Sequence, residues 1–371
     1  MTIAWPQPGH SRATPQVWIL LSGQRGDDNQ LRALAEALGF PFEAQQVRYN
    51  LLRRIAFLRG ERLWHLTREA RRALTPPWPD LVIGLGYASV PISRYIRRQS
   101  GGRTRLVHLG NPRTDLSDID LVLTTPQFPL RPAPNVVVLP LPVGNPAQGA
   151  VLTPEEKSWF ESRPRPLRLI VVGGSTRQWR IRLSDLGCAI DHLESERARY
   201  GGSLIAVTSP RTEPRIARYL RKRLTGAATA CVEAFPRFTA LLAECDEFYV
   251  TADSVSMLSE AVLTRKPVGM IPIARSLRGA LGQVLVRLGL IRSKADLSQF
   301  WHHLTANHFV GSVDSPVASN ASNTVGTAVN AINGLLAQPQ GSRLWRRGQV
   351  QALFAVLENV ASRLCELSED N

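Results

Sequence analysis

This sequence has few lysines, no closely spaced cysteine pairs and no long apolar runs. The last two absences each exclude a class of protein. Only four of the 45 basic residues are lysines, so the net charge of +15 rests on arginine. The four cysteines form no CxxC pair, so neither a zinc site nor a disulfide framework is indicated. No stretch of about 18 apolar residues occurs, and residues 1–16 lack the apolar core of a signal peptide. A cytoplasmic protein is therefore expected.

Several nucleotide and nucleic-acid motifs are also missing. There is no GxGxxG fingerprint and no P-loop, so neither NAD nor ATP is implied, and no cofactor is predicted. No zinc-finger, RRM or KH signature supports nucleic acid as a partner, although the charge alone would suggest it. Arginine binds phosphate and carboxylate well, and basic residues crowd positions 48–105. The charge therefore predicts an anionic ligand, with an acidic membrane surface as a second partner.

What the chain does contain is a repeated pattern of short apolar runs followed by longer helical segments. This alternation predicts βαβ units and parallel sheets, and 371 residues suit two domains. Strands are expected at residues 17–21, 81–84, 106–109, 121–123, 136–139, 167–172, 203–208, 247–250 and 268–271. Helices are expected at about residues 29–38, 88–99, 183–200, 328–336 and 343–365, with a loop at 311–326.

Proline and glycine become frequent between residues 126 and 149, which suggests a domain boundary. We therefore expect a tail at 1–15, a first domain at 16–148 and a second domain at 149–371. Ligands of doubly wound sheets bind at the carboxyl ends of the strands. The polar segments that follow the predicted strands are therefore the candidate sites.

The strongest candidate follows the strand at 247–250. A helix is predicted to start almost at once, with Asp253 or Ser254 as its N-cap. The amides at such a helix start, together with Ser254 and Ser256, suit a phosphate. Glu260 lies about two turns further on, where a carboxylate could accept the hydroxyls of a ribose. An ordinary capped helix is the alternative interpretation.

Two further segments of the second half have the same position relative to a strand. Gly173, Gly174 and Ser175 follow the strand at 167–172, and paired glycines let a backbone approach a diphosphate. Arg177 and Arg180 come next and could bind phosphate, whereas a tight turn is the alternative.

The segment after the strand at 203–208 contains Ser209, Arg211 and Thr212. Two hydroxyls and a planar guanidinium in this place favour a contact with the same ligand. A capped helix start with a solvent-facing arginine would explain the segment equally well.

In the first half, Gly23, Gly26 and Asp27 follow the first strand. Asp27 could deprotonate an acceptor hydroxyl as a general base. Aspartate near a helix start is more often a cap, and Asp28 or Asn29 could serve in that way. Gly86 and Arg113 also lie at strand ends, and with Gly23 and Gly26 they are predicted to line the acceptor side.

Four of these segments carry a resemblance to a known family. Residues 22–30, 172–175, 208–212 and 251–257 are similar to the Elm family, named after a plant mitochondrial-fission factor, whose bacterial members are classed with glycosyltransferases. Residues 251–261 also resemble the donor site of two-domain GT-B glycosyltransferases and non-hydrolysing sugar-nucleotide epimerases.

The resemblance implies two Rossmann-like domains facing across a cleft, with a C-terminal helix crossing back onto the first. It implies a metal-independent glycosyltransferase that moves a sugar from a nucleotide-sugar to an anionic envelope glycan or glycolipid, at the inner face of the membrane. An epimerase-like or hydrolytic use of the same donor is one alternative. A non-catalytic adaptor with the GT-B fold is another.

Overall fold

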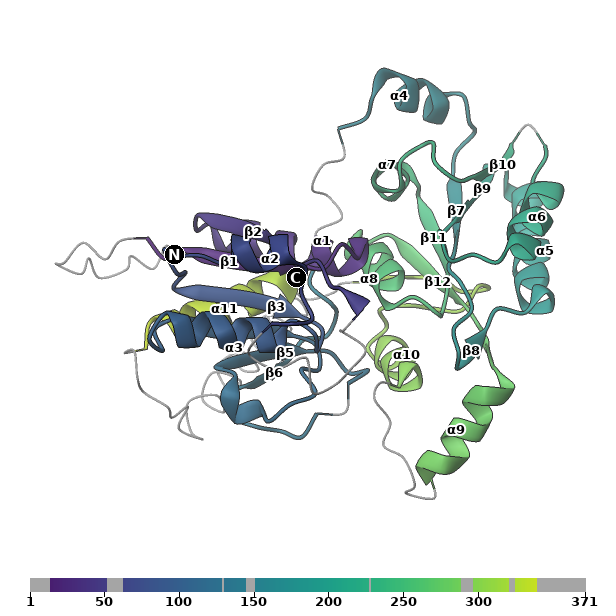
Figure 1. The fold of residues 1–371 in the computed structure, drawn as a ribbon. Coiled ribbons are helices and arrows are strands. Elements are labelled where there is room, and N and C mark those ends of the chain that lie inside the picture. Colours follow the sequence, from purple (N-terminus) through teal and green to yellow (C-terminus); the bar gives the residue numbers. More distant parts are fainter. Residues whose placement is uncertain are drawn as a thin grey trace, which may run out of the picture. The chain divides into compact units, whose positions relative to one another are not determined.

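The chain forms two compact units, seen in the computed structural model, which describes residues 14–51, 63–128, 130–144, 151–226, 228–287, 296–319 and 324–338. The first unit comprises Met1–Thr124, Leu130–Val137 and Ala328–Asn371, and the second comprises Thr125–Pro129 and Val138–Thr327. Figure 1 colours the elements of the first unit purple to blue, with one yellow helix, and most of the second unit teal to green.

The first unit is built on a six-stranded sheet with the order β2-β1-β3-β4-β5-β6. Its strands are β1 (Val17–Leu21), β2 (Phe42–Gln46), β3 (Leu81–Leu85), β4 (Arg105–Leu109), β5 (Leu121–Thr124) and β6 (Val136–Val138). Its helices are α1 (Arg25–Leu38), α2 (Arg68–Ala73), α3 (Val90–Gln99) and most of α11 (Thr324–Leu336), with a short 3-10 turn at Leu116–Asp118. The strands from β2 to β5 run parallel.

The second unit has a sheet with the order β10-β9-β7-β11-β12-β14. Its strands are β7 (Leu167–Val172), β9 (Ser203–Thr208), β10 (Thr229–Val232), β11 (Glu247–Thr251), β12 (Pro267–Ile271) and β14 (Val317–Ala318). Only β14 pairs antiparallel within this sheet. A separate antiparallel ribbon joins β8 (Trp179–Arg180) to β13 (Ala274–Arg275).

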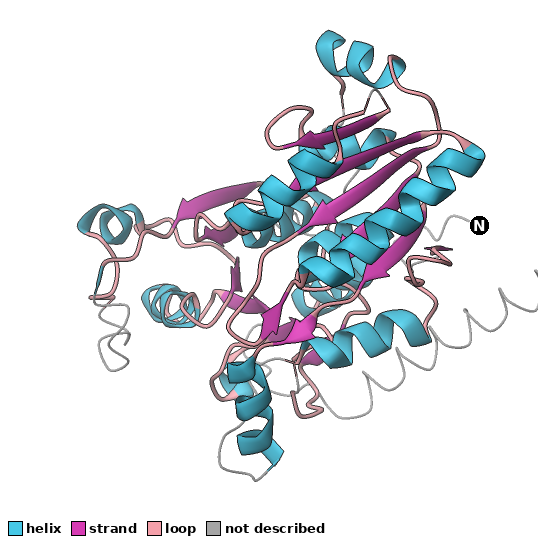
Figure 2. Ribbon diagram, turned by 90° about the vertical axis from the view of Figure 1, so that its right-hand side faces the viewer, coloured by secondary structure: helices cyan, strands magenta, loops and turns pink. Residues whose placement is uncertain are grey.

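Seven helices are described in the second unit, and Figure 2 shows cyan helices packed along the magenta strands. They are α4 (Pro154–Glu161), α5 (Leu183–Tyr200), α6 (Pro214–Arg223), α7 (Phe238–Glu244), α8 (Val255–Leu263), α9 (Leu277–Arg287) and α10 (Leu297–Ala306). Strand β7 explains the layering: Leu169 and Val171 belong to one buried cluster, and Ile170 and Val172 to another. Because both faces of the strand are covered, its sequence is apolar except for Arg168, whose buried guanidinium binds the carboxylate of Glu247.

The two sheets confirm the predicted α/β class with two Rossmann-like doubly wound domains. The predicted crossing of a C-terminal helix is confirmed by α11, which from Ala328 onward belongs to the first unit although it follows the second in sequence. The side chain of Arg105 in β4 donates hydrogen bonds to the carbonyls of Leu335 and Gln338 at the end of this helix. In Figure 1 the yellow helix lies beside the blue elements of that unit.

The start of α1 differs from the prediction. The helix begins at Arg25 rather than at Asn29, with Gln24 as its N-cap, so neither Asp28 nor Asn29 is the cap. The carboxylate of Asp28 instead accepts hydrogen bonds from the amides of Ser22, at 2.9 Å, and Gly23, at 3.0 Å. A carboxylate inside the first turn can reach back in this way because the loop before it doubles over the helix start.

Part of the basic region at residues 48–105 forms ion pairs within the first unit. The guanidinium of Arg97 binds the carboxylate of Asp120, and that of Arg94 binds Asp118. Several predictions lie outside the described residues: most of the tail, part of the basic region at 52–62, the boundary at 148–149 and the helix at 343–365. Among the helices described, none has the length and apolarity needed to cross a bilayer.

Candidate functional site

The candidate site of the second unit lies at the point where the strand order of its sheet reverses. Strand β7 comes first in sequence, β9 and β10 extend the sheet on one side, and β11 and β12 extend it on the other. In such sheets a crevice opens at the carboxyl ends of the two central strands. The segment after β7, residues 173–175, and the segment after β11, residues 252–256, therefore meet at the same edge.

Hydrogen bonds join these two segments directly. The amide of Gly173 donates to the hydroxyl of Thr251 at 2.9 Å, and the amide of Gly174 donates to Oδ2 of Asp253 at 2.9 Å. The Thr251 hydroxyl in turn donates to Oδ1 of Asp253 at 2.7 Å. The amides predicted to meet a diphosphate are thus paired within the protein, and Thr251 is a member of the site that the sequence analysis missed.

Close packing explains both glycines. A Cβ at Gly173 would lie 2.1 Å from Oδ2 of Asp253, and a Cβ at Gly174 would lie 2.2 Å from the carbonyl oxygen of Arg211. The close approach that the glycine pair permits is therefore to the protein itself, as the tight-turn alternative supposed. A contact of this turn with a diphosphate stays a prediction.

The segment after β9 is held to the same turn. The Thr212 hydroxyl lies 2.7 Å from the carbonyl oxygen of Gly173, and it accepts a hydrogen bond from the amide of Ser209 at 2.9 Å. Arg211 remains accessible, with 57% of its side chain exposed and a guanidinium nitrogen 3.8 Å from Oδ2 of Asp253. Of these three residues Arg211 is thus the one placed to meet an anion, while the two hydroxyls fix the loop.

Asp253 is buried, and its charge is balanced by short-range partners. Burial raises the pKa of its carboxyl, whereas the hydrogen bonds from Thr251 and Gly174 and the nearby Arg211 act in the opposite direction. Trp301 of α10 donates its indole N–H to the carbonyl of Ala252 at 2.8 Å. The turn between β11 and α8 is therefore anchored on both sides.

Helix α8 begins with Ser254 as its N-cap, one of the two predicted caps. The Ser254 hydroxyl accepts from the amide of Met257 at 3.5 Å and lies 3.5 Å from the Ser256 hydroxyl. The first amides of a helix have no partner inside it, so those of Val255 and Ser256 remain as donors for an anion. Serine hydroxyls and amides are thus gathered at one helix end, as predicted.

Glu260 lies near the middle of α8 and is half-buried. Among the described residues, no hydrogen-bond or ion-pair partner of its carboxylate is found. Burial raises the pKa of Glu260 to about 7. A desolvated, unpaired carboxyl that lies about two turns beyond a helix N-terminus is a strong candidate for a ligand contact.

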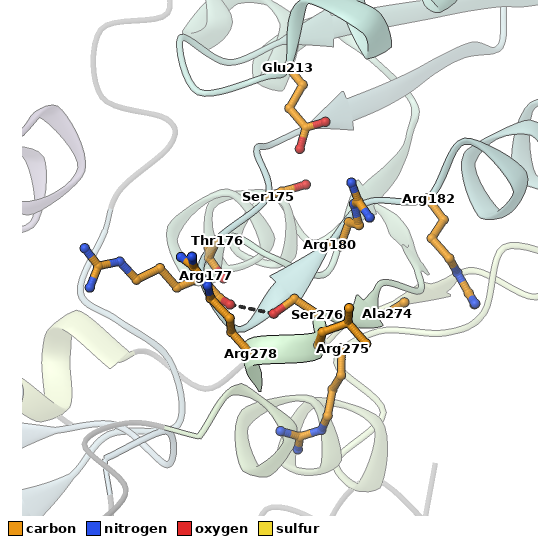
Figure 3. Close-up of a pocket in the computed structure, with 11 residues that line it drawn as sticks. Ser175, Thr176, Arg177, Arg180, Arg182, Glu213, Ala274, Arg275, Ser276 and Arg278 are labelled. Atoms are coloured by element: carbon orange, nitrogen blue, oxygen red, sulfur yellow. Dashed lines mark hydrogen bonds between the residues drawn. The ribbon is translucent and has the colours of Figure 1, made fainter. Parts of the chain in front are cut away.

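A cavity of about 760 Å³ lies beside the turn after β7, and Ser175 and Thr176 of that turn line it (Figure 3). It is lined by five arginines and one glutamate, together with smaller residues: Arg177, Arg180, Arg182, Arg275, Arg278 and Glu213, with Ser175, Thr176, Ala274, Ser276 and Leu277. Ser175, predicted to contact the donor, accepts from the amide of Ile181 at 3.1 Å, and its hydrogen bond to Glu213 is the main cause that lowers the pKa of that carboxyl.

The ribbon of β8 and β13 brings the arginines of this cavity together. Arg180 and Arg275 lie on its two strands, and the guanidinium of Arg275 lies 4.4 Å from the ring centre of Trp179. Arg177 and Arg180 were predicted from the sequence as phosphate partners, whereas Arg275 and Arg278 were not. These two also follow the carboxyl end of a strand, β12, which was the available signal.

The first unit has its own reversal point, between β1 and β3. Asp27 lies in the first turn of α1, and its pKa is raised, first by burial and then by the charge of Asp28. Gly23, with φ of 82°, and Gly86, with φ of 76°, adopt left-handed backbone in the loops after β1 and β3. The structure thus brings Asp27 and Gly23 to one edge of the sheet.

Gly26 lies inside a helix, whereas Arg113 lies in the loop after β4, and their contact with an acceptor stays a prediction. Gly26 is inside α1, where its carbonyl accepts from the side chain of Gln30 at 3.3 Å, so it does not free the backbone of a loop. Arg113 has φ of 53°, and its guanidinium lies 4.9 Å from the ring centre of Tyr87. That contact covers the loop that contains Gly86. Within the described residues no group of three or more His, Cys, Asp and Glu side chains is placed to hold a metal.

The fold and these loops define a protein of two doubly wound units, each with polar residues at the reversal point of its sheet. The chain belongs to the mitochondrial fission ELM1 family, whose family model matches residues 25–303. It is 27% identical to the mitochondrial fission protein ELM1 of Arabidopsis thaliana over 230 residues, which cover 54% of this chain and 53% of the plant protein.

A second relative is an enzyme. The chain is 31% identical over 134 residues to the UDP-N-acetylglucosamine--N-acetylmuramyl-(pentapeptide) pyrophosphoryl-undecaprenol N-acetylglucosamine transferase of Sodalis glossinidius, covering 33% of this chain and 37% of that enzyme. The chain thus spans about half the length of the plant relative and about a third of the transferase. Among solved structures, UDP-GlcNAc 2-epimerase from Methanocaldococcus jannaschii aligns with 86% of this chain and 99% of its own, with a TM-score of 0.48 and 13% identity.

Proposed function

We propose that this protein is a metal-independent glycosyltransferase of the GT-B type that binds a nucleotide-sugar through its second unit. The observation that carries this proposal is the half-buried Glu260, whose pKa is raised to about 7 and which lies in the helix that begins with Ser254. The helix start supplies amides and hydroxyls for a diphosphate, and Glu260 lies about 9 Å further along the axis. That spacing suits a diphosphate and its ribose.

Arg211 is the proposed partner of the diphosphate charge. Its guanidinium is exposed and lies next to the turn that precedes α8. One guanidinium can donate two parallel hydrogen bonds to two phosphate oxygens. This contact would stabilise the negative charge on the leaving group, as a metal does in other enzymes. Asp253 would keep this guanidinium near the turn.

In the proposed reaction the acceptor hydroxyl forms a bond to the anomeric carbon of the sugar. The bond between that carbon and the diphosphate breaks, and the nucleoside diphosphate leaves with the electron pair. Asp27 of the first unit would take the hydroxyl proton, and its raised pKa suits a general base better than an ordinary aspartate. Gly23, Gly86 and Arg113 would line the acceptor, for which we propose an anionic envelope glycan or glycolipid.

The two relatives favour different versions of this function. The name of the Sodalis enzyme describes sugar transfer onto a pyrophosphoryl-undecaprenol acceptor, which supports catalysis and a glycolipid acceptor. The plant relative is named for mitochondrial fission, which supports a second candidate, an adaptor that keeps the fold without catalysis. An epimerase-like use of the same donor is the enzymatic alternative.

Calorimetric titration with nucleoside diphosphates, followed by product analysis with the matching nucleotide-sugars, tests the proposal. We expect binding to the full chain and release of nucleoside diphosphate only when an acceptor is present. Release without acceptor, or isomerised donor, would favour the hydrolytic or epimerase-like alternative. Binding without any turnover would favour the adaptor, and no binding of any nucleotide would rule out the donor site.

A further inference from the structure

Helix α9 presents an apolar stripe to solvent in the second unit. Leu277, Leu281 and Val284 are exposed to 92%, 62% and 50% of their surfaces, and their spacing places them on one side of the helix. Figure 1 shows α9 projecting from the rest of that unit. Exposed leucines at this spacing on a helix are typical of a surface that binds a membrane or a protein partner.

The first turn of α9 is fixed to the body of the unit. The Ser276 amide donates to the carbonyl of Gln178 at 2.9 Å, and its hydroxyl donates to the carbonyl of Arg177 at 2.5 Å. A Cβ at Gly279 would lie 2.2 Å from the Gln178 carbonyl oxygen, so the helix packs closely there. The projecting stripe is therefore held in place at its beginning.

The stripe is continuous with the arginine cavity. Leu277 lines that cavity, as do Arg278 in the same turn and Arg177, Arg180 and Arg275 nearby (Figure 3). Among the described residues that line the cavity, Glu213 is the one carboxylate facing these arginines. Within the described residues, the guanidinium groups of Arg177, Arg180 and Arg278 have no hydrogen-bonded partner. An excess of positive charge thus borders the exposed leucines.

From this arrangement we propose that α9 and the arginine cavity form a docking surface for an anionic lipid membrane. Leu277, Leu281 and Val284 enter the interface of the bilayer, and the arginines bind the phosphate groups of the lipid heads. The pairing of an apolar stripe with a basic cavity fits a phospholipid, which has an acyl chain and a phosphate in one molecule. Neither a free anion nor an apolar peptide would use both halves of the surface.

This inference specifies the membrane contact of the proposed function and places it in the second unit, whereas Arg94, Arg97 and Arg105 of the first unit bind other groups of the protein. It does not depend on sugar transfer. Of the residues predicted to meet the donor, Ser175, Arg177 and Arg180 line the cavity, whereas Ser254, Ser256 and Glu260 do not.

Sedimentation of the full chain with vesicles tests the proposal. Vesicles of phosphatidylcholine alone are compared with vesicles that also contain phosphatidylglycerol, over a series of salt concentrations. We expect binding only to the anionic vesicles, weakening as salt rises. Leu281→Asp should weaken the binding about tenfold or more, since it places a charge in the stripe, and Arg278→Gln about fivefold.

Two matched variants serve as controls. Val151→Asp changes another exposed apolar residue of the same unit, and Arg218→Gln changes another exposed arginine; both should bind vesicles like the unchanged protein. Equal partition onto neutral and anionic vesicles would overturn the proposal. So would an equal loss in Arg218→Gln and Arg278→Gln, which would indicate overall charge alone.

The remaining outcomes separate this surface from other occupants and from the donor site. Self-association that Leu281→Asp abolishes, without vesicle binding, would identify a protein contact instead and overturn the lipid proposal. Binding of inorganic pyrophosphate without vesicle binding would do the same. In calorimetry, Leu281→Asp should keep its affinity for nucleoside diphosphates, so vesicle binding without sugar transfer would count only against the proposed reaction.

Discussion

Gly174 and Asp253 join the carboxyl ends of the two central strands of the second unit through a single hydrogen bond of 2.9 Å. The donor is the backbone amide of the glycine, and the acceptor is the carboxylate of Asp253, which is fully buried. This contact makes the turn after β7 and the turn before α8 one structural element. A ligand held by α8 would therefore depend on the integrity of the glycine turn, even without touching it.

The first prediction concerns that turn. Gly174→Ala should lower the free energy of unfolding by about 3 kcal/mol, the upper end of the usual cost of overpacking. The reason is that the new Cβ would meet the backbone of Arg211 at 2.2 Å, and backbone cannot rotate away as a side chain can. Urea unfolding followed by circular dichroism measures the change.

Gly282→Ala in α9 is the matched control. No heavy atom lies within 4 Å of the position that the new methyl group would take, so this variant should be about 0.5–1 kcal/mol more stable through helix propensity. If both alanine variants unfold at the same urea concentration as the unchanged protein, the close packing at Gly174 has been misjudged.

The second prediction concerns Glu260 and the ribose. Glu260→Gln should weaken binding of a nucleoside diphosphate by about 1.5–3 kcal/mol, the range for hydrogen bonds to a charged group. It should weaken the matching 2′,3′-dideoxy nucleotide much less, because that ligand has no ribose hydroxyls to donate. Calorimetry with both ligands and both proteins measures this difference. An equal loss for the two ligands would show that Glu260 does not contact the ribose.

The third prediction concerns the pH dependence of stability. Burial raises the pKa of Glu260 from 4.5 to about 7. At pH values between these two, folding is therefore coupled to the uptake of a proton by this carboxyl. The stability that this proton provides is complete below pH 4.5 and is lost as the pH rises through about 7.

Relative to Glu260→Gln, the unchanged protein should therefore lose stability as the pH rises over this window, by at most about 1.4 kcal/mol per pH unit. Urea midpoints at a series of pH values for both proteins measure the difference. Parallel pH profiles for the two proteins would mean that Glu260 titrates as an ordinary exposed carboxyl.

The fourth prediction concerns the proposed base. Asp27→Asn should reduce turnover by about 10²–10⁴-fold with little change in nucleotide affinity, because the amide cannot take up the acceptor proton. Glu36→Gln changes an exposed carboxylate on the same helix and should leave turnover unchanged. Full activity of Asp27→Asn would show that Asp27 is not the general base and has only a structural role at the start of α1.

The sequence was sufficient to predict most strands of both sheets, because strands covered on both faces are mainly apolar, as in β7 apart from Arg168 and in β11 between Glu247 and Thr251. It did not reveal β2, since Phe42–Gln46 is a polar strand at the sheet edge. In α4, Thr153 and Glu156 form a capping box, in which each side chain accepts a hydrogen bond from the other residue's backbone amide.

The candidate site was predicted less completely. The positions of Asp253, Ser254 and Glu260 follow from strand and helix lengths, which are local properties of the chain. The pairing of the Gly174 amide with Asp253 joins residues 79 positions apart, and no local pattern could indicate it. The arginine cavity likewise depends on the antiparallel ribbon of β8 and β13, two strands of two residues each.

The place of α11 in the first unit has a consequence for the order of synthesis. During translation the strands of the first unit leave the ribosome first, yet the helix bound by Arg105 is made only after the whole second unit. The first unit must therefore wait, with part of its surface uncovered, until that helix has been added. The second unit is interrupted in sequence by the short segment Leu130–Val137 of the first unit, and its chain is complete before most of that helix has been made.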